Sequence, residues 1–195
     1  IGVKIMIVSF IGLGVMGFPM AGHLISKNKD IKLKVYNRSI KKSEKWAEKF
    51  NGIITTTPAE AAENSDIVFM CVGNDKDVEQ VVRGEKGIIS SISENSIIVD
   101  HTTASSKIAL DLYSFCKSSK NVSFIDAPVS GGQAGAENGQ LTIMVGGDKS
   151  SYLKIEPFLK SYAKNSTLIG NSGSGQLAKM VNQICIAGLL QGLSE

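Results

Sequence analysis

Residues 4–17, with the sequence KIMIVSFIGLGVMG, decide the fold of this chain. The apolar run Lys4–Phe10 predicts a buried β-strand, and Phe18–Ser26 predicts a helix shortly after it. The loop between them has the spacing GxGxxG and consists of Gly12, Leu13, Gly14, Val15, Met16 and Gly17. In such a unit the glycines permit a tight turn, close approach to a pyrophosphate and close packing of helix on strand. We therefore predict that the loop binds the pyrophosphate of a dinucleotide at the helix N-terminus.

Short apolar runs alternate with helical stretches along the rest of the chain. The further predicted strands are Lys32–Tyr36, Ile53–Thr55, Ile67–Cys71, Ser96–Asp100, Ser123–Asp126, Gln140–Val145 and Thr167–Ile169. The further predicted helices are Lys41–Phe50, Pro58–Glu63 with Thr57 as its cap, Lys76–Arg83, Ser105–Cys116 and Ser151–Lys160. Near-continuous apolar strands suit a sheet that is buried on both faces. The pattern predicts an α/β fold, a Rossmann-type doubly wound and mostly parallel sheet.

The last stretch, Gln176–Glu195, departs from this rhythm. Apolar residues cover most of its helical circumference, and such a helix must be buried on several sides. The Rossmann-type domain covers only one side. We therefore expect residues 1–170 to form the dinucleotide-binding domain and residues 171–195 to begin a long interdomain helix that leads toward another domain or subunit. The first residue, Ile1, is not Met, which suggests a trimmed sequence.

The end of the second predicted strand bears on the choice of cofactor. NAD-preferring sites place an Asp or Glu there to hold the ribose hydroxyls. This chain reads Tyr36-Asn37-Arg38-Ser39, without a carboxylate. Arg38 offers a cationic fork for a 2′-phosphate, and Asn37 and Ser39 offer neutral hydrogen bonds. The sequence therefore predicts NADP(H) as cofactor, with NAD(H) second.

Two further segments are suited to substrate binding and chemistry. Ser130, followed by Gly131 and Gly132, can turn several backbone N–H groups toward one anion, such as a substrate carboxylate. Lys179 lies in an otherwise apolar helix, where burial of an ammonium group is costly without a role, and Asn182 shares its helix face. We predict that Lys179 is catalytic.

These segments belong to a set of longer motifs that occur in order along the chain. They are FIGLGVMGFPMAGHL at Phe10–Leu24, NRS at Asn37–Ser39, DHTT at Asp100–Thr103, DAPVSGGQAGAENGQLTIMVGG at Asp126–Gly147 and GSGQLAKMVNQ at Gly173–Gln183. With them the chain resembles the β-hydroxyacid dehydrogenase family, which includes 3-hydroxyisobutyrate dehydrogenases, tartronate semialdehyde reductases and succinic semialdehyde/glyoxylate reductases. The match over Asp126–Gly147 is the most specific.

The resemblance implies a role for each matching residue. Lys179 corresponds to the family's catalytic lysine, acting as general acid and base, and Asn182 beside it is expected to take part in catalysis by orienting the lysine or the substrate. Ser130, Gly131 and Gly132 correspond to the substrate-carboxylate segment, and Thr103 to a residue that contacts the cofactor near the reacting centre. The implied reaction is hydride transfer between NADP(H) and a small β-hydroxy acid, semialdehyde or 2-oxo acid. The resemblance also implies an all-helical second domain, absent from this chain, and a homo-oligomer formed through it and the last helix.

Three alternatives differ at particular residues. A 6-phosphogluconate dehydrogenase-like decarboxylase resembles the first domain, but carries a histidine where this chain has Gln183 after Asn182. Imine reductases share the fold and generally lack the lysine. A non-catalytic NADP-binding or interaction module is disfavoured by Lys179, although this chain could bind NADP without turnover. His101, next to the predicted site, could act as acid or base, but the family pattern does not require it.

Composition excludes several other classes. The net charge is +3, with 43% hydrophobic and 20% charged residues, typical of a globular protein. The lysines are scattered without interleaved aromatics, so we expect no nucleic-acid partner. Three distant cysteines without a CxxC pair argue against a zinc site and disulfides. No long uncharged apolar run predicts a membrane span, and the expected location is the cytoplasm, with an organelle left open.

Overall fold

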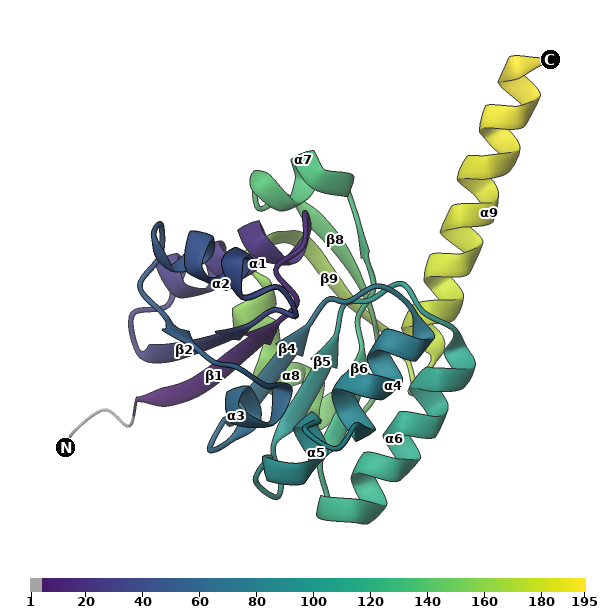
Figure 1. Cartoon of the computed structure of the whole chain (residues 1–195). Coiled ribbons are helices and arrows are strands. Elements are labelled where there is room, and N and C mark those ends of the chain that lie inside the picture. Colours follow the sequence, from purple (N-terminus) through teal and green to yellow (C-terminus); the bar gives the residue numbers. More distant parts are fainter. Residues whose placement is uncertain (1–4) are drawn as a thin grey trace.

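The computed structural model describes residues 5–195, so Ile1 and Lys4 lie outside the described residues. One mixed sheet, with helices on both faces, organises the described part (Figure 1). Its strands are β1 (Met6–Ile11), β2 (Ile31–Tyr36), β3 (Ile53–Ile54), β4 (Ile67–Met70), β5 (Ile97–Asp100), β6 (Ser123–Asp126), β7 (Val129–Ser130), β8 (Leu141–Gly146) and β9 (Ala163–Gly170). The helices are α1 (Gly17–Lys27), α2 (Ile40–Ala47), α3 (Pro58–Ala62), α4 (Asp75–Arg83), α5 (Ile88–Ser91), α6 (Ser106–Lys120), α7 (Gly132–Glu137), α8 (Lys149–Leu159) and α9 (Ser174–Ser194).

The strand order confirms the predicted fold class. The strands follow the order β3-β2-β1-β4-β5-β6-β8-β7, and β9 pairs with β8. All pairs from β3 to β6 are parallel, as crossover helices require. Strand β8 runs antiparallel to β6 and β7, which makes the sheet mostly rather than wholly parallel. The sequence did not predict β7, α5 or α7, each of which has six residues or fewer.

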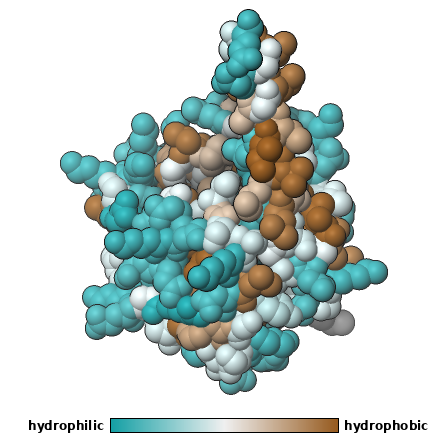
Figure 2. All heavy atoms as spheres, turned by 90° about the vertical axis from the view of Figure 1, so that its right-hand side faces the viewer, coloured by the Kyte–Doolittle hydropathy of each residue, from teal (hydrophilic) through white to brown (hydrophobic). Residues whose placement is uncertain are grey.

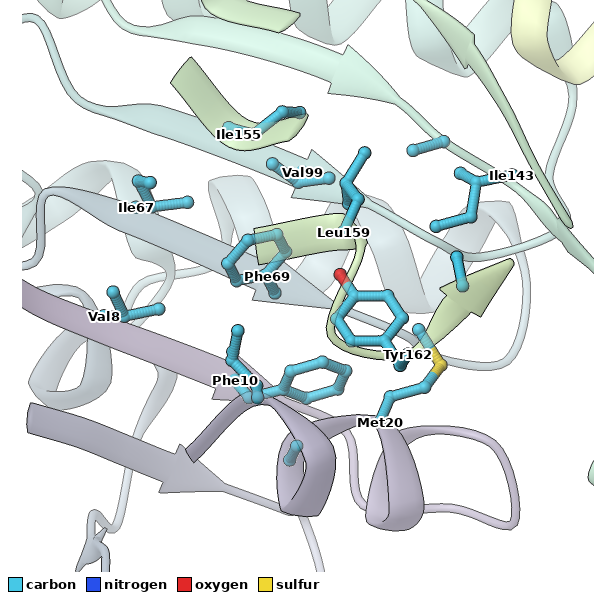
Figure 3. Packing of buried hydrophobic residues seen from close by; sticks show 14 of the residues in the cluster. Val8, Phe10, Met20, Ile67, Phe69, Val99, Ile143, Ile155, Leu159 and Tyr162 are labelled. Atoms are coloured by element: carbon cyan, nitrogen blue, oxygen red, sulfur yellow. The ribbon is translucent and has the colours of Figure 1, made fainter. Parts of the chain in front are cut away.

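Both faces of the sheet are buried in separate hydrophobic cores. Successive residues of β4 point to opposite faces, so Ile67 and Phe69 pack in one core and Val68 and Met70 in the other. Figure 3 shows the first core, where Phe69 lies near Leu159, the last residue of α8, and near Tyr162, which follows that helix. Burying each such large side chain contributes about 1.5–3 kcal/mol. Continuous apolar strands are therefore what this two-sided sheet requires.

Helix α9 leaves the body of the domain (Figure 1). Only its beginning is buried, at Gly175, Gln176 and Lys179. Figure 2 shows brown apolar atoms along the helix as it rises from the domain. Its exposed apolar side chains are Leu177, Met180, Val181, Ile184, Ile186, Leu189, Leu190 and Leu193. The expected burial on several sides is therefore not met within the described residues, and a surface of this kind marks a contact region.

No helix in residues 5–195 combines the length and the hydropathy needed to cross a bilayer.

The cap of α3 allows a test of the local structure. Thr57 precedes the helix, and its hydroxyl accepts a hydrogen bond from the Glu60 N–H at 3.0 Å, as its position before Pro58 predicted. Thr57→Ala should lower the free energy of unfolding by about 1 kcal/mol, because a helix-terminal N–H loses its acceptor. Urea unfolding followed by circular dichroism measures the change. Thr57→Ser keeps the hydroxyl and should lose less; equal losses would contradict the cap.

Candidate active site

Two positions of the glycine loop leave no room for a side chain. Gly12 has φ 95°, and a Cβ there would overlap the carbonyl oxygen of Cys71 at the end of β4. A Cβ on Gly17 would overlap the carbonyl oxygen of Gly12, so loop and helix start also touch. Gly14 differs, because its Cβ would meet nothing within 4 Å. The backbone at Gly14 therefore borders open space.

That space is a groove of about 760 Å³ along the carboxyl ends of β1, β2 and β4. The predicted cofactor residues that line it are Gly12, Gly14, Val15, Met16, Gly17, Asn37, Arg38 and Ser39. Its volume and its bare backbone at Gly14 fit a dinucleotide. Of the predicted loop, only Leu13 does not line the groove, because its side chain is buried in the core. Thr103, the remaining predicted cofactor residue, does not line this groove.

Asn37 holds the loop in place. Its Oδ1 accepts a hydrogen bond from the Leu13 N–H at 2.9 Å, and its Nδ2 donates to the Ser39 carbonyl oxygen at 3.1 Å. Both ends of the amide are thus engaged within the protein. From the end of β2, Asn37 therefore fixes the glycine loop while it also lines the groove.

Four charged side chains line the groove. Arg38, Lys42 and Lys86 line it, together with the carboxylate of Asp77. The Arg38 Nη1 lies 3.5 Å from the Asp77 Oδ1. Sequence reasoning sought an acidic residue only at the end of β2 and missed Asp77. The signal was its place in the first turn of α4, at the carboxyl edge of the sheet where ligands bind.

A second cavity, of about 510 Å³, adjoins the groove and shares Met16 and Cys71 with it. The predicted substrate and catalytic residues that line it are Thr103, Ser130, Gly131, Gly132 and Lys179. Residues as far as 76 positions apart in the sequence are thereby brought to one place. Asn182 does not line this cavity, and its Nδ2 is buried without a hydrogen-bond partner among the described residues. Gln183, one residue on, lines the cavity instead.

A buried carboxylate seats the start of α9 beside this cavity. The Asp126 Oδ1 accepts a hydrogen bond from the Gly173 N–H at 2.7 Å, and its Oδ2 accepts one from the Gln176 N–H at 3.0 Å. A negative charge at a helix N-terminus is stabilising. Gly175 allows the close approach, because a Cβ there would lie 2.8 Å from the same carboxylate. Asp126 of β6 therefore fixes the start of the helix that carries Lys179.

The side chain of Gln176 ties α9 to the loop after β5. Its Nε2 donates to the Thr102 carbonyl oxygen at 2.7 Å, and its Oε1 accepts from the Ala104 N–H at 3.1 Å. Gln176 is fully buried. These two bonds fix the loop that carries Thr103 relative to the helix that carries Lys179. Sequence reasoning assigned Gln176 no role.

Burial changes the titration of two candidate acid–base groups. Lys179 is 8% exposed, and desolvation lowers the pKa of its ammonium group. Burial also lowers the pKa of His101 to about 4, against the opposing hydrogen bond to the Ala127 carbonyl oxygen. The other ring nitrogen of His101 lies 2.8 Å from the Tyr162 hydroxyl. His101 is thus a neutral ring held on both sides, which favours a structural role.

Within residues 5–195, no cluster of three or more His, Cys, Asp or Glu side chains could hold a metal ion.

The fold and the groove define a class, the NAD(P)-binding domain of a dehydrogenase. Residues 7–170 match the family model described as the NAD binding domain of 6-phosphogluconate dehydrogenase. An uncharacterized oxidoreductase of Shewanella frigidimarina is 53% identical over 188 residues, which cover 96% of this chain and 64% of that protein.

Two solved structures have the same arrangement. The 3-hydroxyisobutyrate dehydrogenase of Mycobacterium tuberculosis with L-serine has a TM-score of 0.85 and 27% identity, covering 94% of this chain and 60% of its own. Psf3 in complex with NADP+ and 2-OPP has a TM-score of 0.84 and 26% identity, covering 96% and 68%. The chain belongs to the β-hydroxyacid dehydrogenase family and matches the N-terminal, cofactor-binding part of its members. It spans less than two thirds of the length of the Shewanella relative.

Asp100 provides a test of the electrostatics beneath the site. Burial, followed by the negative charges of Asp126 and Asp75, raises the pKa of Asp100 from 3.8 to about 7. Between these values the unfolded chain releases a proton that the folded chain keeps, so folding loses stability as pH rises from 4 to 7. Asp100→Asn stays neutral and keeps an acceptor for the Thr102 N–H. Wild type should therefore lose stability between pH 5 and pH 8, whereas the variant should not. The free energy of unfolding of the variant, minus that of wild type, should rise by roughly 2 kcal/mol over this range.

Urea unfolding of both proteins at the two pH values measures this gain. Asp30→Asn, at an exposed position, is the control for the loss of one negative charge. An equal effect of Asp100→Asn at both pH values would contradict a neutral, buried Asp100 at the lower pH.

Proposed function

We propose that this chain is the NADP-binding part of an oxidoreductase that transfers a hydride between nicotinamide and a small β-hydroxy acid, semialdehyde or 2-oxo acid. One observation carries the proposal: Lys179, Thr103 and the segment Ser130–Gly132 line one cavity that opens beside the dinucleotide groove. The proposed division of the chain is a cofactor domain at residues 1–170 and the start of an interdomain helix at residues 171–195.

The substrate carboxylate is proposed to bind at Ser130, Gly131 and Gly132. Gly131 has φ 128° and Gly132 has φ 61°, conformations that favour glycine. A Cβ on Gly132 would meet nothing within 4 Å, so an anion can approach the backbone there. Backbone N–H groups turned in this way form an anion-binding concavity.

Lys179 is proposed as the general acid and base. When bound, the reduced nicotinamide supplies the hydride to the carbonyl carbon. Lys179, as ammonium, polarises the substrate carbonyl and gives a proton to its oxygen; in the opposite direction, neutral Lys179 accepts the hydroxyl proton. Desolvation lowers the pKa of Lys179, and this favours exchange of the proton nearer to neutral pH. The cavity lining favours Gln183 over the predicted Asn182 as the amide that orients the substrate.

NADP(H) is proposed as the cofactor because Arg38, Lys42 and Lys86 line one groove. Three cations near a ribose favour a 2′-phosphate over a hydroxyl. The NADP+ bound to the similar Psf3 structure agrees with this. Arg38 is proposed to hold the 2′-phosphate.

Substrate screening tests the proposed activity. The chain, and a fusion of it to the C-terminal part of a family member, are assayed with NADPH and NADH. The substrates are glyoxylate, succinic semialdehyde, tartronate semialdehyde and methylmalonate semialdehyde. Turnover of at least one by the fusion is expected. Tight NADPH binding without turnover by either protein would favour the non-catalytic binding module.

The role of Lys179 predicts a separation of catalysis from cofactor binding. In the fusion protein, Lys179→Ala should lower kcat about 100- to 10,000-fold, because the proton donor is lost. The Kd for NADPH, measured by its fluorescence, should change less than about threefold, since Lys179 lines the second cavity and not the groove. Lys164→Ala, at an exposed position in β9, is the control. Undiminished kcat would exclude Lys179 as the acid.

Arg38 predicts the cofactor preference. Arg38→Gln should raise the Kd for NADPH about tenfold or more and leave the Kd for NADH within about twofold, because only NADPH carries the 2′-phosphate. Lys32→Gln removes one positive charge from β2 outside the groove and is the matched control. Tighter binding of NADH than of NADPH by the wild-type chain would contradict the proposal that NADP(H) is the cofactor.

A further inference from the structure

Arg38 and Asp77 form an ion pair that joins the two sides of the groove. Arg38 follows β2, whereas Asp77 lies in the first turn of α4, and their side chains are 3.5 Å apart. Both residues line the groove where the adenosine half of a dinucleotide is expected. Asp77 is the only carboxylate among the described residues of this lining. Arg38 therefore already has an anionic partner at the place where a 2′-phosphate would seek it.

Asp77 is the more firmly held of the two partners. Its N–H donates to the Asn74 Oδ1 at 3.1 Å, which caps the helix and fixes the start of α4. Its carboxylate lies so close to Gly73 that a Cβ there would overlap it. The side chain of Asp77 is 33% exposed, whereas that of Arg38 is 89% exposed. Asp77 is thus a fixed negative charge, and Arg38 extends into solvent toward it.

We propose that Asp77 is a specificity-determining residue that restrains the affinity of the groove for NADP(H) relative to NAD(H). It does so by holding Arg38 and by repelling a 2′-phosphate, whereas a 2′-hydroxyl meets neither obstacle. The proposal rests on the proposed use of Arg38 for the cofactor. It identifies a residue that sequence reasoning, confined to the end of β2, did not consider.

The size of the effect follows from the exposure of the pair. An exposed ion pair contributes little free energy, so a phosphate can replace the carboxylate on Arg38. Lys42 and Lys86 remain in the groove to attract the phosphate in either case. Asp77 therefore reduces NADPH affinity by a modest factor and does not abolish binding. Removal of its charge should improve NADPH binding about fivefold.

Cofactor titrations of the whole chain test the proposal. The Kd values for NADPH and NADH are measured by cofactor fluorescence at one ionic strength for wild type, Asp77→Asn, Arg38→Gln and the double variant. Asp77→Asn should lower the Kd for NADPH about fivefold and change that for NADH less than about twofold. In the Arg38→Gln background the gain should shrink, because Asp77 no longer competes for the arginine. Glu79→Gln, an equal charge change on α4 outside the groove, should leave both Kd values unchanged.

Three outcomes would overturn the role of Asp77: an unchanged or higher Kd for NADPH, equal changes for both cofactors, or the same gain with Glu79→Gln. Circular dichroism melting confirms that each variant is folded. Failure of the NADP assignment itself is a separate result, namely tighter NADH binding by the wild-type chain. In that case the shift in the NADPH-to-NADH ratio on Asp77→Asn still decides whether Asp77 sets the preference.

Discussion

The arrangement of the candidate site depends on the buried carboxylate of Asp126 at the N-terminus of α9. Asp126 is the last residue of β6, and helix α9 begins far along the chain after β9. Two hydrogen bonds from Gly173 and Gln176 to this carboxylate join them. Desolvation raises the pKa of Asp126, and the hydrogen bonds from Gly173 and Gln176 oppose that shift. A charge this buried is tolerated because the helix end satisfies it.

The joint at Asp126 explains how an exposed helix can carry a precisely placed lysine. Most of α9 has no neighbour among the described residues, yet its first turns are fixed by Asp126, by the side chain of Gln176 and by contact at Gly175. The loop with Thr103 and the helix with Lys179 are therefore held together by direct hydrogen bonds. The glycine loop is fixed independently by Asn37. Two local anchors thus set the distance between the cofactor groove and the second cavity.

Most of the fold could be predicted from the sequence because its determinants are local. Apolar runs such as Ile67–Met70 and the GxGxxG spacing each depend on neighbouring residues only. The elements that the sequence did not predict, β7, α5 and α7, are too short for a periodic pattern of apolar residues to develop. Sequence motifs predicted Lys179 and Ser130 as site residues, and both line the second cavity. The sequence did not reveal which way other side chains point: Asp77 lines the groove from α4, and Gln183 rather than Asn182 lines the second cavity.

The setting of Trp46 gives the chain an internal optical label. It is the only tryptophan in the sequence, it is fully buried, and its indole N–H donates to the Phe18 carbonyl oxygen at 3.1 Å. Phe18 lies in the first turn of α1, directly after the glycine loop. A single buried indole, beside the helix at which the pyrophosphate is proposed to bind, emits light that reduced nicotinamide absorbs. Energy transfer from Trp46 can therefore follow occupation of the groove without any attached dye.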